Sequence, residues 1–536
     1  MSKVGTIVII VAAVLPFIYI HNAHSISFPV NQGFLNSASR VFRYPNRYND
    51  IIEISLHNSY VSPVYSAHTE ERSHPDFTDN DLDKRINEAL KHNFVRRLEN
   101  STGYIPTSFD ICVLAAVPEL FHENFSIRHE NHLDTLLNLR KLYLQKVEEE
   151  SQLSQLSNRR SDLAKDYLTS GTSQPSIKES SITLRNEIKS LEASIRKLKD
   201  DIRSLVNRLP NIVSEDVPKT DTVVQKVYSG TTKAKGQQTT IPHDEVIARF
   251  SEFFTSKSTK IAGTGFSAFS GDISRLERAL INFMLDTHHK LFGYKEVSVP
   301  FVVNSSTLEA TGHLQRFEND LFKLDDRHQC SGDPGYLIPT GEIPLISLLS
   351  NTRLQQNKLP LWLMAYTPCF RAEIQDYGRE TRGLIRNHQF GKVELICVCD
   401  ATASTDFHEL MISHIEFILE SLDLPYRRVL LPANELGSTS NKTIDLEVYF
   451  PSLRKYIEVS SCSNTLDYQS NKLGILTRSG SKVHCINGSG LAIGRTLSAI
   501  LENYQVIKDS GRLEIAIPHI LQPYLEGDQS LAEPLP

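Results

Sequence analysis

The sequence predicts an α+β protein in which a helical hairpin precedes a body of strands and helices. Two long stretches between residues 131 and 210 repeat apolar side chains at helical spacing, with turn residues between them. Residues 442–469 instead alternate apolar and polar side chains, as paired strands do. Residues 367–396 crowd charged side chains between short apolar runs, which an ordinary helix or strand does not need for burial. We therefore expect a ligand site in the body.

Length, charge and cysteine content exclude several classes of protein. The 536 residues are enough for two or three domains, and the formal net charge of -6 gives no overall signal for nucleic-acid binding. The seven cysteines are odd in number and lack paired C-x-x-C spacing with nearby histidines. Cys397 and Cys399 are explained better by one face of a buried strand. The sequence predicts neither a disulfide framework nor a zinc site, and any RNA contact must be local.

The first 108 residues predict a leader in two parts. Residues 1–25 begin with a basic residue, continue through an apolar run and end in A-H-S, which is typical of a cleaved secretory signal peptide. A retained signal anchor is the alternative, although the apolar run is short for a membrane span and contains Pro16. Residues 26–108 form a second, low-order part, whose first half is basic and poor in acidic residues, as transit peptides are.

A signal peptide followed by a transit peptide resembles the leader of proteins sent through the secretory route to a secondary plastid such as the apicoplast. We expect that destination, with a mitochondrion or the endomembrane system as alternatives. We also expect no stable membrane insertion once the signal peptide is removed.

An arm of two antiparallel helices is predicted within residues 109–215. The first long helix repeats the apolar residues Leu133, Leu136, Leu137, Tyr143, Leu144 and Val147. The second carries an uninterrupted heptad seam at Leu184, Ile188, Leu191, Ile195, Leu198, Ile202, Leu205 and Leu209. The Gly/Pro/Ser segment 169–176 reverses the chain, and Pro210 ends the second helix.

The seam alone indicates a helix–helix contact and specifies no further partner. Residues 131–210 hold fourteen Lys and Arg against eleven Asp and Glu, a local surplus of +3 in a chain that is negative overall. This surplus modestly favours a phosphate backbone as the partner of the arm.

The body is predicted over residues 216–528, with residues 529–536 as a tail. A linker, residues 209–233, joins it to the arm. A helix from about Ile273 to Phe292 has one apolar face, ends at a glycine and leads into a short strand. Taken alone, this helix could equally be a plain amphipathic element of the core.

The charged segment 367–396 suits a nucleotide. Arg371 and Arg386 can grip phosphate oxygens through their guanidinium forks, and Glu373 can accept a hydrogen bond from an exocyclic amine. The ring of Phe390 and the carboxylate of Glu394 belong to the same set. Each arginine alone is more often a solvated surface charge, but the combination favours a site.

Three further groups suit ligand chemistry. Thr340 and Glu342 are two positions apart, so on an extended chain they would face the same way and bind an ammonium or hydroxyl group, or simply cap a strand end. Glu458 and Ser461 offer oxygen atoms that suit Mg²⁺, although an isolated E-x-x-S is usually a chance match. A Gly-rich turn then enters an apolar helix that carries Arg495, and a helix N-terminus favours anions.

Together these segments resemble class II aminoacyl-tRNA synthetases, in the form found in seryl-tRNA synthetases. Residues 367–396 resemble motif 2, residues 273–300 resemble motif 1, and residues 487–505 resemble motif 3. The resemblance covers about residues 109–527. It implies a core of mixed, mainly antiparallel sheet with flanking helices, a homodimer formed through motif 1, and an arm that grips serine tRNA.

The resemblance also implies the site residues. Those for ATP are Arg371, Glu373, Arg386, Phe390, Glu458, Val459, Ser460, Ser461 and Arg495. Those for serine are Thr340, Gly341, Glu342, Arg371, Glu394, Asn487 and Ser489. The implied catalytic residues are Arg371, Arg386 and Arg495, and Glu458 and Ser461 are the implied Mg²⁺ ligands.

Individual roles follow from the same resemblance. Arg371 would hold the α-phosphate and the substrate carboxylate, and Arg386 the outer phosphates. Glu373 would bind the adenine amino group, Phe390 and Arg495 would cover the two faces of adenine, and Glu394 would bind the ammonium and hydroxyl of serine. Two features depart from the family: Gly341 replaces the usual alanine, and the loop at residues 374–378 is bulkier.

The expected function is serine–tRNA ligation with ATP and Mg²⁺ as cofactors. An arm-less relative that loads carrier proteins would have no use for the hairpin. A non-catalytic paralogue that binds RNA or a partner would be expected to lose the motif 2 or motif 3 arginines, which are present. A synthetase for another small amino acid is harder to exclude, because one methylene is worth only about 1–3 kcal/mol of discrimination.

Overall fold

The structure, a computed structural model, describes residues 109–170, 175–231, 240–254, 257–314, 320–325, 327, 329–373 and 382–534. Before residue 109 it assigns only five short strands: β1 (Thr6–Ile9), β2 (Ser25–Ile26), β3 (Ile51–Ile52), β4 (Val95–Arg97) and β5 (Tyr104–Pro106). The rest of the predicted leader lies outside the described residues. Within the described part, no helix combines the length and apolarity needed to cross a lipid bilayer.

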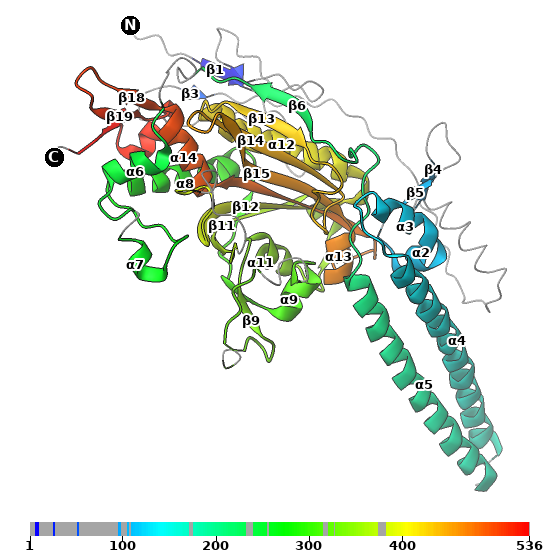
Figure 1. The fold of residues 1–536 in the computed structure, drawn as a ribbon. Helices are drawn as coiled ribbons and strands as arrows, with labels where there is room; N and C mark the ends of the chain where they lie inside the picture. The colour runs from blue at the N-terminus through cyan, green and yellow to red at the C-terminus, as the bar shows by residue number, and fades with distance from the viewer. Residues whose placement is uncertain are drawn as a thin grey trace.

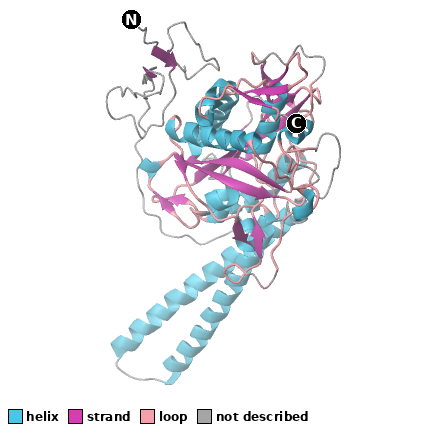
Figure 2. Cartoon of the chain, turned by 90° about the vertical axis from the view of Figure 1, so that its left-hand side faces the viewer, coloured by secondary structure: helices cyan, strands magenta, loops and turns pink. Residues whose placement is uncertain are grey.

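Two long helices form an arm that projects from the body (Figure 1). Helix α4 spans Leu133–Ser170 and α5 spans Pro175–Asn207, and Figure 2 shows the same hairpin from another side. Most residues of the predicted seam are buried, five of them on α5 and one just after it: Leu184, Ile188, Ile195, Leu198, Ile202 and Leu209. Two short helices, α2 (Ile111–Ala116) and α3 (Pro118–Ser126), pack against the base of α4.

The predicted apolar face of α4 is partly wrong. Leu137 and Leu144 are 43% and 42% exposed, whereas Leu136 and Leu139 are fully buried. The buried pair packs into a cluster that includes Phe121 of α3 and the end of α5. Because α4 must contact both α5 and the two short helices at its base, its buried face follows these neighbours instead of a single helical stripe.

An eight-stranded sheet forms the centre of the body. Its strands, in spatial order, are β6 (Val223–Tyr228), β13 (Tyr426–Leu430), β14 (Lys442–Phe450), β15 (Lys455–Leu466), β17 (Val483–Ala492), β12 (Gln389–Asp400), β11 (Leu361–Phe370) and β7 (Lys295–Glu296). All neighbours are antiparallel except β11 and β7, which are parallel. The mixed, mainly antiparallel sheet is therefore confirmed.

Strand β6 lies inside the segment that the sequence predicts to be a linker. It pairs with β13 at the edge of the sheet, and Val223, Val224 and Val227 remain exposed there. An edge strand with no buried face lacks the alternation that identifies strands in a sequence, which explains the error.

Several helices pack against this sheet. They are α6 (His243–Phe250), α8 (Asp272–Lys290), α12 (Ser404–Ser421) and α14 (Ile493–Asn503). The predicted apolar face of α8 is confirmed, because Leu276, Leu280, Phe283 and Met284 are all buried. Helix α8 also begins and ends within two residues of the predicted positions.

The remaining elements surround the sheet. The helical ones are α7 (Thr259–Ala262), α9 (Ser305–Ala310), α11 (Glu342–Ser347), α13 (Tyr468–Leu473), η3 (Gln356–Lys358), η5 (Ala401–Ala403) and η6 (His519–Leu525). The strands are β8 (Val302–Asn304), β9 (Gly335–Leu337), β10 (Arg353–Leu354), β16 (Leu476–Thr477), β18 (Gln505–Ile507), β19 (Leu513–Ala516) and β20 (Ser530–Ala532). The predicted tail thus contributes β20, which pairs with β19 and buries Leu531, so it belongs to the body.

Candidate active site

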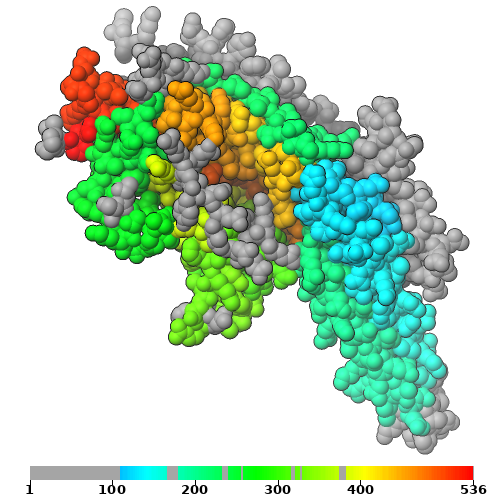
Figure 3. Space-filling view, viewed as in Figure 1, coloured from blue at the N-terminus to red at the C-terminus, as the bar shows by residue number. Residues whose placement is uncertain are grey.

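A cavity of about 330 Å³ opens between the sheet and helices α11 and α14. Figure 3 shows the body hollowed on this face, between its green and orange parts. Thirteen of the residues that the resemblance implies line it: Thr340, Glu342, Arg371, Glu373, Arg386, Phe390, Glu394, Glu458, Val459, Ser461, Asn487, Ser489 and Arg495. Residues far apart in the sequence are therefore brought to one place.

Strand register explains how the central sheet supplies these groups. Phe390, Lys392 and Glu394 are alternate residues of β12, so all three face the cavity. On the neighbouring strand β17, Ser489 lies opposite Glu394, and Asn487 faces the same side two residues earlier. Side-chain alternation on two paired strands thus builds the floor of the site.

The cavity has two ends that differ in exposure. The buried end consists of Thr340, Glu342, Lys392, Glu394, Asn487 and Ser489, each at most 9% exposed. The arginine end consists of Arg371, Glu373, Arg386, Phe390, Glu458 and Arg495, all of them half-buried or exposed.

Three groups of the buried end share one hydrogen-bonded cluster. Thr340 Oγ1 donates to Glu394 Oε2 at 2.7 Å, and Lys392 Nζ donates to Thr340 Oγ1 at 2.9 Å and pairs with Glu394. Burial raises the pKa of Glu394, and the charge of Glu342 raises it too, while Lys392 opposes both. Lys392 is a site residue that the sequence analysis missed.

Glu342 does not lie on an extended chain, as the sequence predicts, but begins helix α11. Gly341 has φ −68° and ψ −16°, and Pro344 fits in the first turn because its missing N–H would have no helical partner there. A Cβ atom at Gly341 would lie 2.9 Å from Thr367 Oγ1, so the glycine allows close packing beneath the site. Glu342 and Thr340 nevertheless both reach the cavity.

The arginines at the other end are held by protein groups. Arg386 pairs with Glu373, and Arg495 donates to the Glu458 carbonyl at 2.7 Å and pairs with its carboxylate at 3.3 Å. Arg371 donates to the Pro339 carbonyl at 3.2 Å, and its guanidinium lies 5.4 Å from the centre of the Phe390 ring. An arriving nucleotide would have to replace some of these partners.

Oxygen atoms suited to a metal ion gather near Arg495. Glu458, Ser461 and Asp445 all line the cavity, and Asp445 lies opposite Ser461 in the ladder between β14 and β15. Burial raises the pKa of Asp445 well above its usual range, and Glu458 adds to this effect. Asp445 Oδ1 has no hydrogen-bond partner among the described residues. Carboxylate and hydroxyl oxygens fit a hard divalent cation, so Asp445 joins the predicted pair.

Ser460 does not face the cavity. Its hydroxyl donates to the Ser489 carbonyl at 2.6 Å, and the residue is 1% exposed, so it braces β17 instead of contacting a ligand. The bulky loop predicted at residues 374–378, with Arg379 beyond it, lies outside the described residues.

Comparison with known proteins identifies relatives. Residues 322–504 match the family model of the tRNA synthetase class II core domain (G, H, P, S and T). The serine–tRNA ligase of Psychrobacter sp. strain PRwf-1 is 41% identical over 358 residues, which cover 65% of this chain and 82% of the relative. The serine–tRNA ligase of Brachyspira hyodysenteriae is 38% identical over 429 residues, 78% of this chain and 98% of the relative.

Solved structures show the same likeness. The crystal structure of a seryl-tRNA synthetase from Pyrococcus horikoshii, complexed with ATP, matches with a TM-score of 0.69 and 26% identity. The match covers 80% of this chain and 100% of that one.

Proposed function

The chain belongs to the seryl-tRNA synthetase family, and we propose that the buried end of its cavity holds serine while the arginine end holds ATP. The protein is a serine–tRNA ligase: it activates serine with ATP to seryl-adenylate and transfers serine to the 3′ end of serine tRNA. In the first step the serine carboxylate attacks the α-phosphorus and pyrophosphate leaves. In the second, the terminal ribose hydroxyl of the tRNA takes the seryl group and AMP leaves.

The buried end offers groups for the ammonium and the hydroxyl of serine. Glu394 can accept hydrogen bonds from the ammonium and the hydroxyl, and Ser489 and Asn487 lie beside it on β17. Lys392 supplies a positive charge beside Glu394 and holds that carboxylate in place. A small cavity lined by hydroxyl, amide and carboxylate groups favours a hydroxyl-bearing side chain.

The arginine end supplies positive charge where the reaction builds negative charge. The guanidinium of Arg371 lies over the ring of Phe390, and Phe390 belongs to the strand that also carries Glu394. We assign it to the α-phosphate and the serine carboxylate, Arg386 to the outer phosphates, and Arg495 with Phe390 to adenine. No protein nucleophile is required, since positioning and fixed charge lower the barrier.

Binding of ATP would exchange ion pairs at this end. Arg386 would leave Glu373 for the outer phosphates, and Glu373 would then accept a hydrogen bond from the adenine amino group. Both side chains are partly exposed, at 35% and 18%, so breaking their pair costs little.

Glu458, Ser461 and Asp445 would hold Mg²⁺. The ion would neutralise phosphate charge and orient the leaving pyrophosphate, as is usual when oxygen ligands and substrate phosphates share Mg²⁺.

One observation carries the functional proposal: a buried, serine-sized cluster built around the paired strands β12 and β17 shares one cavity with Arg371, Arg386 and Arg495. Serine-dependent exchange of pyrophosphate into ATP tests it, on the chain from residue 107 onward. We expect exchange with serine, much weaker exchange with threonine, alanine or cysteine, and none with Arg371→Ala. If the folded protein catalyses pyrophosphate exchange with none of these amino acids, the better explanation is a non-catalytic paralogue that binds RNA or a partner.

The arm is proposed to grip serine tRNA. Its surplus of positive charge supports this role, and it projects from the body as a separate hairpin (Figure 1). Reversing the charge of Arg185, Lys189 and Arg196 on the exposed face of α5 should raise the KM for tRNA and leave pyrophosphate exchange unchanged. An unchanged KM for tRNA would contradict the assignment.

The dimer and the destination are proposed from the sequence. Motif 1, which contains α8, would form the subunit interface, and sedimentation equilibrium would report the mass. Residues 1–108 would direct the protein to an apicoplast-like plastid through the secretory route. Plastid targeting would be contradicted if a fluorescent fusion of these residues were uniformly secreted or kept in the endoplasmic reticulum.

A further inference from the structure

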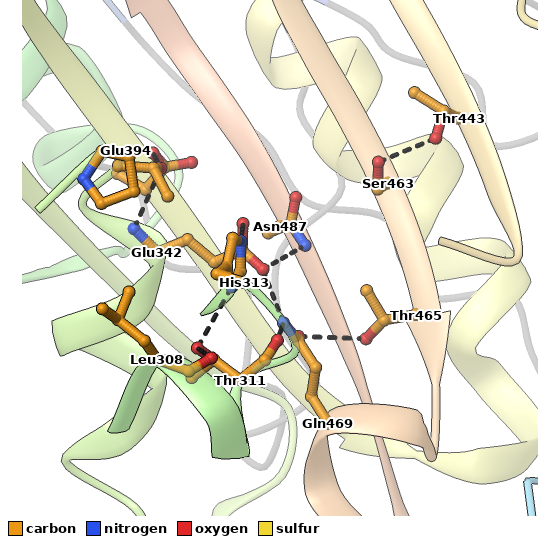
Figure 4. Close-up of polar contacts among 12 residues, drawn as sticks. Leu308, Thr311, His313, Glu342, Glu394, Thr443, Ser463, Thr465, Gln469 and Asn487 are labelled. Carbon is orange, nitrogen blue, oxygen red and sulfur yellow. Dashed lines mark hydrogen bonds and ion pairs between the residues drawn. The ribbon is translucent and has the colours of Figure 1, made fainter. Parts of the chain in front are cut away.

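The carboxylate of Glu342 is surrounded by donors from three other segments of the chain. Gln469 Nε2 donates to Oε1 at 2.6 Å, and Asn487 Nδ2 donates to the same oxygen at 3.1 Å. His313 Nε2 lies 3.5 Å from Oε2 (Figure 4). Both oxygens of this buried carboxylate therefore face groups supplied by the protein.

The two ring nitrogens of His313 have different neighbours. Nδ1 lies 3.1 Å from Thr311 Oγ1, whose hydroxyl can donate to it. The same hydroxyl also reaches the carbonyls of Thr307 at 3.0 Å and Leu308 at 3.2 Å, but these already accept backbone N–H groups. Nε2 is the nitrogen that faces the Glu342 carboxylate.

The nitrogen that faces Glu342 is the one that presents a proton. A bare Nε2 lone pair would repel the carboxylate oxygen that it faces, whereas an N–H forms a charge-assisted contact. The two side chains are only 8% and 10% exposed, so little water is present to relieve such a repulsion. Although burial acts to raise the pKa of Glu342, His313 and then Gln469 and Lys392 outweigh it, and the pKa is lowered.

An ionised Glu342 fixes the orientation of Asn487. Because the amide nitrogen of Asn487 donates to Glu342, its oxygen is the atom left for other contacts, and Figure 4 shows that oxygen turned away from Glu342. Asn487 lines the cavity two residues before Ser489, and Ser489 lies opposite Glu394 on the neighbouring strand. The charge state of Glu342 thus sets which atom of Asn487 a ligand meets.

We propose that His313 is a positioning residue for the amino-acid substrate: it holds Glu342 ionised and aimed at Asn487, with Gln469 as the opposing clamp. This rests on the proposed placement of serine at the buried end of the cavity. His313 also lines the cavity, and in this proposal it acts through Glu342 and Asn487. Its loss should therefore weaken serine binding selectively.

The test compares His313→Leu, which has no donor, with His313→Gln, whose amide can still donate to Glu342. In serine-dependent pyrophosphate exchange we expect His313→Leu to raise the KM for serine about tenfold, because a buried charged group loses a hydrogen-bonding partner. The KM for ATP should change less than about twofold, and His313→Gln should recover most of the serine affinity. His519→Leu, at an exposed histidine outside the cavity, is the matched control.

Each outcome decides the proposal. An unchanged KM for serine in His313→Leu, parallel rises in both KM values, or a glutamine variant no better than leucine would overturn it. If His313→Leu does not fold, the glutamine variant and Gln469→Leu provide the same comparison, with serine affinity expected to fall in the second only. Exchange by the unaltered protein tests the proposed function separately, and its absence would overturn both.

Discussion

The two ends of the cavity hold similar charges in different ways. At the buried end, Lys392 and Glu394 have side-chain exposures of 10% and 2% and already form a closed cluster with Thr340. At the arginine end, Arg495 and Glu458 pair with side-chain exposures of 28% and 46%. One end is prepared before the substrate arrives, and the other must exchange partners.

This difference matches what each substrate requires. Serine is small, so discrimination depends on a few polar groups whose directions are fixed in advance by burial and by hydrogen bonds. ATP carries several negative charges. The arginines can bind them after they break their weak ion pairs with partly exposed carboxylates. Exposed pairs are worth little, whereas a buried charge without its partner is costly, and four experiments exploit this contrast.

Lys392→Met should produce the largest effect. It leaves Glu394 buried without its nearest positive charge, so we expect the free energy of unfolding to fall by about 3 kcal/mol or more and serine-dependent exchange to be lost. Denaturant unfolding and pyrophosphate exchange measure the two effects. The double variant Lys392→Met with Glu394→Gln removes the unpaired charge, so it should regain most of the stability but none of the activity.

Arg386→Ala should affect activity strongly and stability weakly. Its pair with Glu373 is partly exposed, so the free energy of unfolding should change by less than about 1 kcal/mol. Losing a cation that faces the outer phosphates should lower kcat by about a hundredfold. A loss of stability as large as that of Lys392→Met would remove the distinction between the two ends.

Asp445→Asn separates the metal ligands from both substrate sites. We expect the Mg²⁺ concentration that gives half-maximal exchange to rise about tenfold, since one ligand oxygen carries no charge after the change. The KM for serine should stay the same. Asp509→Asn, at an exposed position outside the cavity, is the control, and an equal Mg²⁺ requirement in both variants would contradict the assignment.

The sequence predicted those site residues that belong to recognisable motifs, and most of them line the cavity. Lys392 could have been found as well, because it lies between Phe390 and Glu394 at the strand period of two. Asp445 also left a signal: it is an acidic residue between two apolar ones within a strongly alternating strand.

Other features leave no local signal. His313 and Gln469 meet Glu342 only because the tertiary fold brings three distant segments together. The edge strand β6 has no buried face, so its pattern is that of a linker. Helix α11 starts at Glu342 because of packing beneath the sheet. The spacing of Thr340 and Glu342 alone carries no information about that packing.

Lys472 lies at the junction of arm and body. Of the four experiments, its replacement has the smallest expected effect. Burial lowers its pKa to about 7, opposed by Glu309. Its ammonium donates to the Tyr468 hydroxyl at 2.7 Å, and Tyr468 in turn donates to the Leu209 carbonyl at the end of the arm. It is thus a partly buried cation whose charged form the fold disfavours.

The sign of the pH effect follows from proton binding. Between about pH 7 and the ordinary lysine value, the unfolded chain binds a proton that the folded protein does not, so Lys472 makes stability rise with pH across that window. Below about pH 7 Lys472 is protonated in both the folded and the unfolded chain, and the full free-energy cost of burying its charge applies. Lys472→Met should therefore raise the free energy of unfolding by about 1 kcal/mol at pH 6, since the ring contact with Tyr468 offsets part of the penalty. The gain should shrink at pH 9, and a gain that is equal at both pH values would show that lost packing strain, and not charge, is responsible.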